Sequence, residues 1–130
     1  VCSSDLLAGL SMGSMQTSIV TMKHPDMFGY AGVFSGFVGP FNKTNAENSY
    51  IQLLDDREKF TQSFRVFFRA CGDEDLVALE RFEADRALFE EKGLAPAENS
   101  IHVEKMYPGE HEWNVWRMCL RDFAQYLFHE

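Results

Sequence analysis

The sequence predicts an α/β fold, in which helices cover both faces of a parallel sheet. Three observations lead to this prediction. Apolar stretches of strand length alternate along the chain with stretches of helical periodicity. Each candidate strand is followed by a candidate helix, and this alternation is typical of parallel strands joined by crossover helices. The chain has 130 residues, of which 45% are hydrophobic, and this suits one domain with a packed core.

The first half of the chain contains two predicted strands. Residues 6–10 form a short apolar run that fits the end of a buried strand, and residues 30–34 form the second. Between them, apolar residues recur at helical spacing, at Met12, Met15, Ile19 and Met22. His24-Pro25 ends this helix, because the residue before a proline disfavours helical geometry. The stretch 35–48 carries Gly, Pro and Asn and predicts a loop, and residues 50–60 predict one or two short helices.

The second half adds two strands and two helices. Residues 64–71 and 101–106 are predicted strands. Between them lies a helix over 77–92, with Gly93 as its C-terminal signal. The last helix is predicted by an apolar stripe with steps of three and four residues: Trp113, Trp116, Leu120, Phe123 and Leu127.

Composition excludes several classes of function. Lys and Arg number 12 and Asp and Glu 20, so the net charge is −8, whereas a nucleic-acid partner requires clustered positive charge. No apolar run approaches the roughly 20 residues that cross a bilayer, so we expect no membrane span. Cys2, Cys71 and Cys119 form no Cys-x-x-Cys pair, and we expect free thiols. A disulfide between Cys71 and Cys119 is the less favoured alternative.

A Gly-x-Ser-x-Gly motif at residues 9–13 lies between the first predicted strand and the first predicted helix. A nucleophile elbow, a sharp turn that lifts a serine hydroxyl above the sheet, lies at this place in a fold. We expect glycine at positions 9 and 13 because side chains there would clash in so sharp a turn. The helix that follows directs its N-terminus at the site and favours developing negative charge. The alternative is an ordinary glycine-rich turn in which Ser11 caps the helix.

A serine nucleophile requires a base, and His111 is the histidine best placed to supply one. It follows the last predicted strand, so it would lie at the same sheet edge as Ser11. His24 ends a helix, His102 lies within a strand and His129 is next to the last residue, so these three are less suitable. Taken alone, a histidine at this place is more often a surface residue or the start of a helix than a catalytic base.

The acid that orients the histidine is expected at the end of a third strand. Gly72-Asp73-Glu74-Asp75 follows the strand at 64–71, and either aspartate could reach the site. For Asp73 a turn residue is the preferred interpretation, whereas Asp75 is as consistent with a helix N-cap as with the acid. The residues alone therefore leave the choice between them open.

Several motifs together resemble the putative esterase family of α/β-hydrolases, which includes esterase D, feruloyl, acetyl-xylan and enterochelin esterases. The matching stretches are AGLSMG at 8–13, QT at 16–17, KHPDMF at 23–28, FSG at 34–36, ACGDED at 70–75 and GEHEWNVW at 109–116. The chain order Ser, Asp, His also matches α/β-hydrolases. One departure is Ser14, where the family often has a second glycine, and we expect little effect from so small a side chain.

The resemblance also selects among the candidate residues. The family's Gly-x-x-Asp motif falls on residues 72–75 and selects Asp75 over Asp73. Its Gly-x-His-x-Trp motif falls on residues 109–113 and supports His111. The implied roles are nucleophile for Ser11, base for His111 and orienting acid for Asp75, with the backbone N–H of Met12 as one oxyanion donor.

The implied function is a serine esterase that hydrolyses carboxylic esters, with carbohydrate-linked or feruloyl-type esters as expected substrates. No cofactor and no metal are required. A thioesterase or peptidase of the same fold stays open, because the same three residues serve any acyl group. A non-catalytic binding domain of this fold is the alternative from another class, and an intact Ser-Asp-His set argues against it. The sequence predicts neither oligomeric state nor cellular compartment.

The resemblance covers about residues 8–128, which correspond to the C-terminal half of family members. We therefore expect residues 7–130 to be the C-terminal portion of a single α/β-hydrolase domain. The N-terminal strands, a second oxyanion donor and much of the substrate pocket would lie outside it. Residues 1–6, VCSSDL, match what a widely used sequencing-library adapter encodes in one reading frame, and we expect them to be a cloning or assembly artefact.

Overall fold

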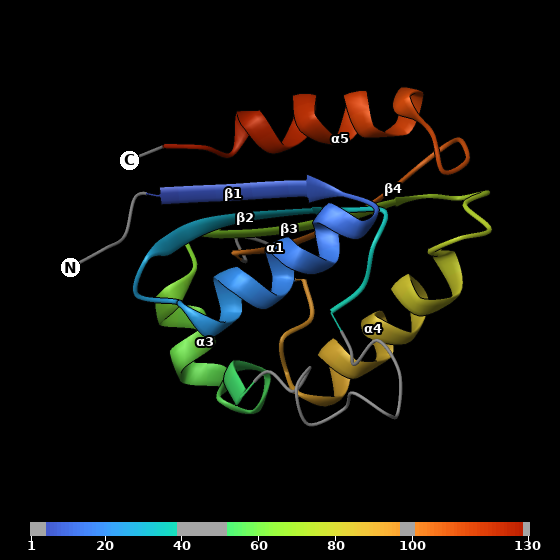
Figure 1. The fold of residues 1–130 in the computed structure, drawn as a ribbon. Helices are drawn as coiled ribbons and strands as arrows, with labels where there is room; N and C mark the ends of the chain where they lie inside the picture. Colours follow the sequence, from blue (N-terminus) through green and yellow to red (C-terminus); the bar gives the residue numbers. More distant parts are fainter. Residues whose placement is uncertain (1–4, 39–51, 97–100, 129–130) are drawn as a thin grey trace.

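Four parallel strands form one sheet in the computed structural model, which describes residues 5–38, 52–96 and 101–128 (Figure 1). The strands β1 (Asp5–Leu10), β2 (Phe28–Phe34), β3 (Val66–Gly72) and β4 (His102–Tyr107) lie side by side in this order. All three neighbouring pairs run parallel. The predicted α/β class with a parallel sheet is therefore confirmed.

Helices cover both faces of this sheet (Figure 1). On one face lie α1 (Met12–Lys23), the short 3-10 helix η2 (Gln52–Asp55), α3 (Arg57–Ser63) and α4 (Leu79–Glu91). On the other face lies α5 (Trp113–Gln125). The order of elements agrees with the sequence prediction, and the bounds of α1 are those predicted. The strand ends differ by one or two residues, and α4 begins two residues later than predicted.

Aromatic side chains fill the space on both faces of the sheet. Under α3 and α4, Phe60, Phe64, Phe67 and Phe89 pack with centroid distances of 5.2 to 6.5 Å. Under α5, the buried residues are Tyr30, Phe34, Val66, Phe68, Ala70, Tyr107, Val115, Cys119 and Phe123. Both faces of β2 and β3 are thus covered, as parallel strands require.

The face that α1 turns toward the sheet differs from the one its apolar spacing predicts. Its buried residues are Ser14, Thr17, Ser18, Thr21 and Met22, whereas Met12 and Ile19 are exposed. Burial of the polar face is possible because each of these hydroxyls donates to a backbone carbonyl three or four residues earlier in the chain. Small side chains also let α1 lie close to the glycine-containing strand β1.

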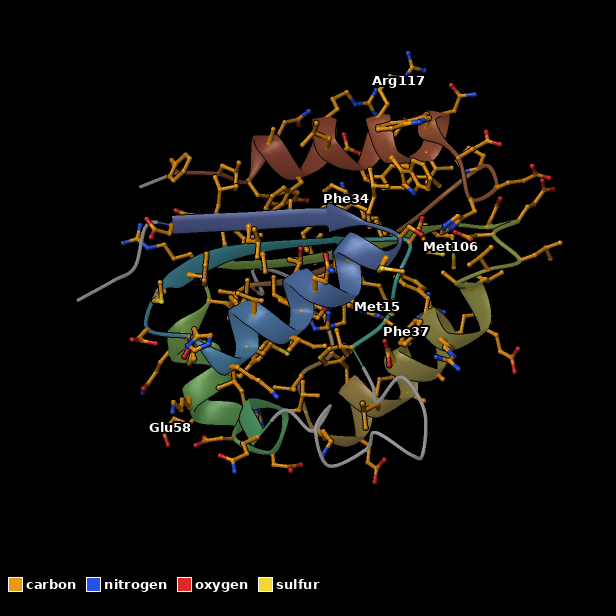
Figure 2. All side chains as sticks on the ribbon, viewed as in Figure 1. Met15, Phe34, Phe37, Glu58, Met106 and Arg117 are labelled. Carbon is orange, nitrogen blue, oxygen red and sulfur yellow. The ribbon has the colours of Figure 1, made fainter. Side chains whose placement is uncertain are left out.

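The predicted stripe of α5 is likewise only partly buried. Val115, Cys119 and Phe123, spaced four residues apart, face the sheet. Trp113 and Leu120 are 70% and 56% exposed, and both line an apolar groove of about 620 Å³ beside Leu10. Figure 2 shows Phe34 between the sheet and α5, and Arg117 on the outer side of that helix.

The expectation of free thiols is confirmed for two of the three cysteines. Cys71 and Cys119 are both buried, and neither forms a disulfide. Burial raises the pKa of each thiol to about 12, so neither is a reactive thiolate at neutral pH. Cys2 and His129 lie outside the described residues, as does part of the predicted loop at 35–48. Within the described ranges, no helix is both long and apolar enough to cross a membrane.

Candidate active site

Ser11 lies in the sharp turn between β1 and α1, in a backbone conformation that serine rarely adopts. Its φ and ψ angles are 56° and −123°. Residues other than glycine are held in such a region only where the surrounding structure enforces it, and these positions cluster at active sites. The Ser11 N–H donates to the carbonyl of Phe34 at 3.0 Å, which ties the turn to the end of β2. The turn has the features of a nucleophile elbow.

The two motif glycines have different reasons to be glycine. A Cβ on Gly9 would lie 2.2 Å from the Gly13 carbonyl oxygen, so the predicted clash is real at this position. A Cβ on Gly13 would have no neighbour within 4 Å, so the prediction of a clash there is wrong. The backbone of Gly13 occupies the space that a side chain at position 9 would need, and this is why position 9 requires glycine.

Ser14 is an internal part of the elbow. It is fully buried, and its hydroxyl donates to the carbonyl of Ser11. A Cβ on Gly36 would lie 1.6 Å from the Ser14 hydroxyl oxygen. Position 36 must therefore be glycine when position 14 is serine. The departure from the family pattern at Ser14 is thus accommodated by the loop that follows β2.

The structure brings Ser11, His111 and Asp75 together at the carboxyl edge of the sheet. The His111 Nε2 atom lies 2.8 Å from the Ser11 hydroxyl, and Nδ1 lies 2.8 Å from the Asp75 Oδ2. A carboxylate only accepts, so Nδ1–H donates to Asp75 and the Nε2 lone pair accepts from Ser11. The three residues come from three different strand ends, and they form one continuous chain of hydrogen bonds.

Asp75 is completely buried at the start of α4. Its Oδ1 accepts from the N–H groups of Val77 and Ala78, each at 2.9 Å, which leaves Oδ2 for His111. Burial alone raises the pKa of this carboxyl. The hydrogen bonds from His111 and from the two backbone N–H groups outweigh that effect, and the pKa lies below its usual value. The carboxylate is therefore ionised at neutral pH.

Asp73, the other candidate acid, has a different partner. Its Oδ1 accepts from the N–H of Gly109 at 3.0 Å, and its side chain is exposed. The contact connects the loop after β3 to the loop that carries His111. Asp73 thus serves the turn, whereas Asp75 reaches the histidine.

A cavity of about 330 Å³ opens beside this set of residues. It is lined by Ser11, Met12, Met15, Ser35, Gly36, Phe37, Val77, Ala78, Arg81 and His111. Figure 2 shows Met15 and Phe37 below the sheet, between α1 and α4. Met12 follows Ser11 at the first position of α1, which places its backbone N–H at the N-terminus of the helix.

Two residues near the site, Ser35 and Trp116, make contacts that the sequence patterns did not predict. The Trp116 indole N–H donates to the Ser35 hydroxyl at 2.9 Å, and the Trp116 ring packs edge-on against His111. Sequence reasoning placed Trp116 in an apolar stripe and in the matching stretch 109–116, and Ser35 in the stretch 34–36, but it assigned neither residue a role. In the part of the chain that the structure describes, no group of three or more His, Cys, Asp or Glu side chains could hold a metal ion.

Comparisons with known proteins identify the family of this chain. The family model described as "Putative esterase" matches residues 2–126. A curated protein from Xylanibacter ruminicola, named endo-1,4-beta-xylanase/feruloyl esterase, is 32% identical over 127 residues, which cover 94% of this chain and 14% of that protein.

Solved structures show the same fold. The feruloyl esterase module from Clostridium thermocellum, complexed with sinapinate, superposes with a TM-score of 0.68 at 22% identity, over 96% of this chain and 46% of that one. S-formylglutathione hydrolase from Staphylococcus aureus superposes with a TM-score of 0.62 at 17% identity, over 93% and 50%. The chain thus spans half or less of the length of these proteins.

Proposed function

Because the chain belongs to the putative esterase family, we propose that it carries the catalytic residues of a serine hydrolase that cleaves carboxylic esters. The observation that carries the proposal is the unbroken series of hydrogen bonds from Ser11 through His111 to Asp75. A serine hydroxyl is a weak nucleophile unless a base lies within hydrogen-bond reach, and that base must itself be oriented. The His111 Nε2 atom lies 2.8 Å from the Ser11 hydroxyl, and its Nδ1 atom lies 2.8 Å from the Asp75 carboxylate that would orient it.

The proposed reaction has two halves. In the first, the Ser11 oxygen attacks the ester carbonyl while His111 Nε2 takes the hydroxyl proton and returns it to the departing alcohol. In the second, a water molecule attacks the acyl-enzyme, His111 takes its proton, and Ser11 leaves with that proton as the acid is released. Asp75 holds Nδ1–H and stabilises the imidazolium that forms in each half. The backbone N–H of Met12 would supply one donor to the oxyanion.

For the substrate we propose carbohydrate-linked or feruloyl-type esters. The names of the curated relative and of the Clostridium thermocellum module support this class. The cavity beside Ser11 includes the apolar side chains of Met15, Phe37 and Val77 in its lining, which suits an ester with an apolar acyl group. We further propose that residues 7–130 are the C-terminal portion of one hydrolase domain.

Hydrolysis of p-nitrophenyl acetate and methyl ferulate by the intact protein tests the proposal. Replacing Ser11 with Ala removes the nucleophile, and we expect turnover to fall by roughly 10⁴-fold or more. Ser63→Ala is the matched control, because the Ser63 hydroxyl donates only to Lys59 within α3 and lies away from the site. Equal turnover by both variants would contradict the assignment. Hydrolysis of the acetate without the ferulate would retain the esterase and reject the feruloyl class.

A further inference from the structure

We propose that Trp116 is a positioning residue, which fixes the His111 ring against Ser11 through its hydrogen bond to Ser35. This inference rests on the proposed function and assigns a role to two residues outside the Ser-His-Asp set. His111 lies in the loop between β4 and α5, and its side chain is 20% exposed. The two hydrogen bonds of the imidazole lie in the plane of its ring, so contacts against the ring must supply the remaining restraint.

Trp116 supplies a contact of this kind. The centroids of the Trp116 and His111 rings lie 5.1 Å apart, with an angle of 87° between the two planes. Edge-to-face packing of this geometry is favourable for aromatic pairs and fixes their relative orientation. The Trp116 ring is itself held by a hydrogen bond, because Nε1–H donates to the Ser35 hydroxyl at 2.9 Å.

Ser35 is a rigid anchor for this hydrogen bond. It is buried, it follows β2 with a φ of 54°, and its N–H donates to the carbonyl of Ala70 in β3 at 2.8 Å. The preceding residue, Phe34, accepts the N–H of Ser11 through its carbonyl oxygen at 3.0 Å. The anchor of Trp116 and the anchor of the nucleophile are therefore adjacent residues.

The contacts close into a ring. From Ser11 the path runs through the end of β2 to Ser35, across the hydrogen bond to Trp116, over the aromatic contact to His111, and back to the Ser11 hydroxyl. A closed path fixes the separation of the nucleophile from its base, although they lie 100 residues apart in sequence. Asp75 orients the imidazole from outside this ring.

Trp113 provides an internal comparison. It packs on Trp116 with a centroid distance of 5.3 Å, and it is 70% exposed. Trp116, in contrast, is half-buried and contacts both the base and Ser35. The two indoles differ in their contacts with the site, so a pair of matched substitutions separates positioning from aromatic packing.

The experiment measures the rate at which a fluorophosphonate labels the intact protein, together with kcat and KM for an ester. Trp116→Phe keeps an aromatic ring and removes the N–H, and Ser35→Ala removes the acceptor. We expect each to slow labelling and lower kcat by about 10- to 100-fold with little change in KM, because a small displacement of a catalytic group costs this much. Trp113→Phe should label within about twofold of the wild-type rate.

The double variant tests the hydrogen bond itself. If Ser35 acts through Trp116, Ser35→Ala in the Trp116→Phe background should cause no further loss. Labelling of both single variants at the wild-type rate would overturn the inference, as would losses that multiply in the double variant. If Trp116→Phe fails to fold, Ser35→Ala still decides, because it removes a single oxygen atom. A wild-type protein that does not label at all would overturn the proposed function and this inference with it.

Discussion

Two buried aspartates, Asp75 and Asp85, lie ten residues apart around the start of α4, and they have different kinds of partner. Asp75 contacts His111 at the sheet edge, beside a cavity. Asp85 lies inside the fold and pairs with Arg69, with 3.7 Å between the guanidinium and its Oδ2. Both carboxylates accept backbone N–H groups, so burial and hydrogen bonding alone do not distinguish them.

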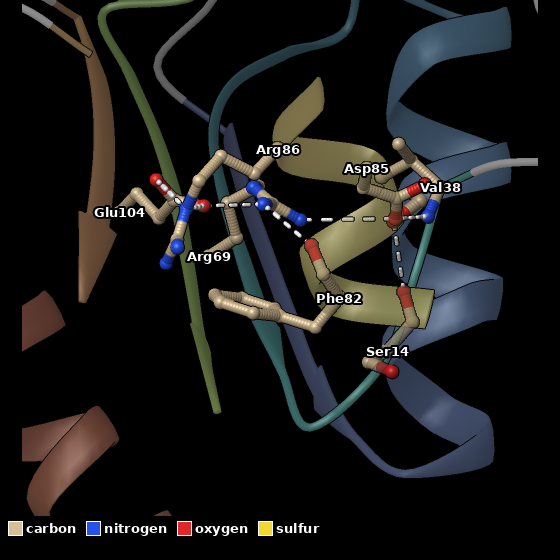
Figure 3. Close-up of polar contacts among 8 residues, drawn as sticks. Ser14, Val38, Arg69, Phe82, Asp85, Arg86 and Glu104 are labelled. Atoms are coloured by element: carbon tan, nitrogen blue, oxygen red, sulfur yellow. Dashed lines mark hydrogen bonds and ion pairs between the residues drawn. The ribbon is translucent and has the colours of Figure 1, made fainter. Parts of the chain in front are cut away.

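Arg69, Phe82, Asp85 and Glu104 form a set of polar contacts, called the Arg69 cluster below (Figure 3). This cluster holds β3, β4, α4 and the loop after β2 together. Arg69 is 1% exposed, and its Nη2 atom donates to Glu104 at 2.6 Å and to the Phe82 carbonyl at 3.1 Å. Its guanidinium lies 4.2 Å from the centre of the Phe82 ring. Asp85 also accepts the N–H of Val38 at 2.6 Å. Burial lowers the pKa of Arg69, and the two carboxylates oppose that effect.

The partner decides what each cluster can do. An arginine stays protonated over the whole physiological range, so the Arg69 cluster can hold elements in place but cannot transfer a proton. A neutral imidazole has one ring nitrogen that accepts a proton, so in the proposed reaction His111 can receive the proton of Ser11. The two clusters also differ in whether a substrate could reach them, because His111 lines a cavity whereas Arg69 is buried.

The largest expected effect is a loss of turnover when Asp75 is replaced. In Asp75→Asn the amide Oδ1 can still accept from Val77 and Ala78, but the amide nitrogen facing His111 favours the wrong tautomer. We expect kcat for ester hydrolysis to fall by about 10⁴-fold. Asp73→Asn is the matched control, because the amide can still accept from Gly109, and it should remain within about threefold of wild type. A smaller loss for Asp75→Asn than for Asp73→Asn would refute the assignment.

The next effect separates the clusters by stability. Arg69→Met leaves Asp85 buried without its cation, and we expect the free energy of unfolding in urea to fall by about 3–5 kcal/mol. The double variant Arg69→Met/Asp85→Asn should recover part of this loss, because it also removes the unpaired charge. Esterase turnover per folded molecule should change far less than in Asp75→Asn. A loss of turnover without a loss of stability would contradict the structural role of this cluster.

Much of the fold and of the candidate site could be predicted from the sequence, because their signals are local. The bounds of α1 follow from the apolar spacing that begins at Met12 and from His24-Pro25 at the other end. The sharp turn at Ser11 and the loops carrying Asp75 and His111 follow strand ends, and parallel strands bring such ends to one edge. Residue patterns alone did not decide between Asp73 and Asp75, although they favoured a turn role for Asp73, because the difference between them lies in the direction of a side chain.

The remaining features depend on packing between distant elements. Nothing near Arg69 in sequence shows that Asp85 and Glu104 surround it, and a charged residue within a strand is ordinarily read as an exposed position. The apolar spacing of α1 predicted the wrong buried face, because hydroxyls that bond within the helix can be buried in place of Met12 and Ile19. The role of Gly36 likewise depends on Ser14, which lies 22 positions away.

A smaller effect concerns a third buried group, His102, which lies in β4 among Phe60, Phe67 and Phe89. Burial lowers its pKa to about 4, and the Leu94 carbonyl opposes the shift. The unfolded chain binds a proton near pH 6.5, whereas the folded chain does so only near pH 4. Its contribution to stability is therefore present above pH 6.5 and lost as the pH falls toward 4, by up to about 3 kcal/mol.

Urea unfolding of His102→Phe between pH 7 and pH 4 measures this contribution. The variant keeps an aromatic ring among the phenylalanines and lacks the titrating group, so its stability should decline less steeply than that of wild type. Parallel decline of the two proteins would show that His102 binds a proton equally well in the folded and unfolded chains. The Nδ1 atom of His102 contacts the carbonyl of Leu94, whereas that of His111 contacts the carboxylate of Asp75.

The central claim is that the contacts of Ser11 make it an activated nucleophile. Treating the intact protein with a fluorophosphonate and locating the adduct by peptide mass spectrometry tests this claim most directly, since only an activated serine reacts. We predict one adduct, on Ser11, which is lost in Ser11→Ala and formed at least about 10³-fold more slowly in His111→Ala. An unlabelled wild-type protein, an adduct on another serine, or equal labelling in His111→Ala would contradict it.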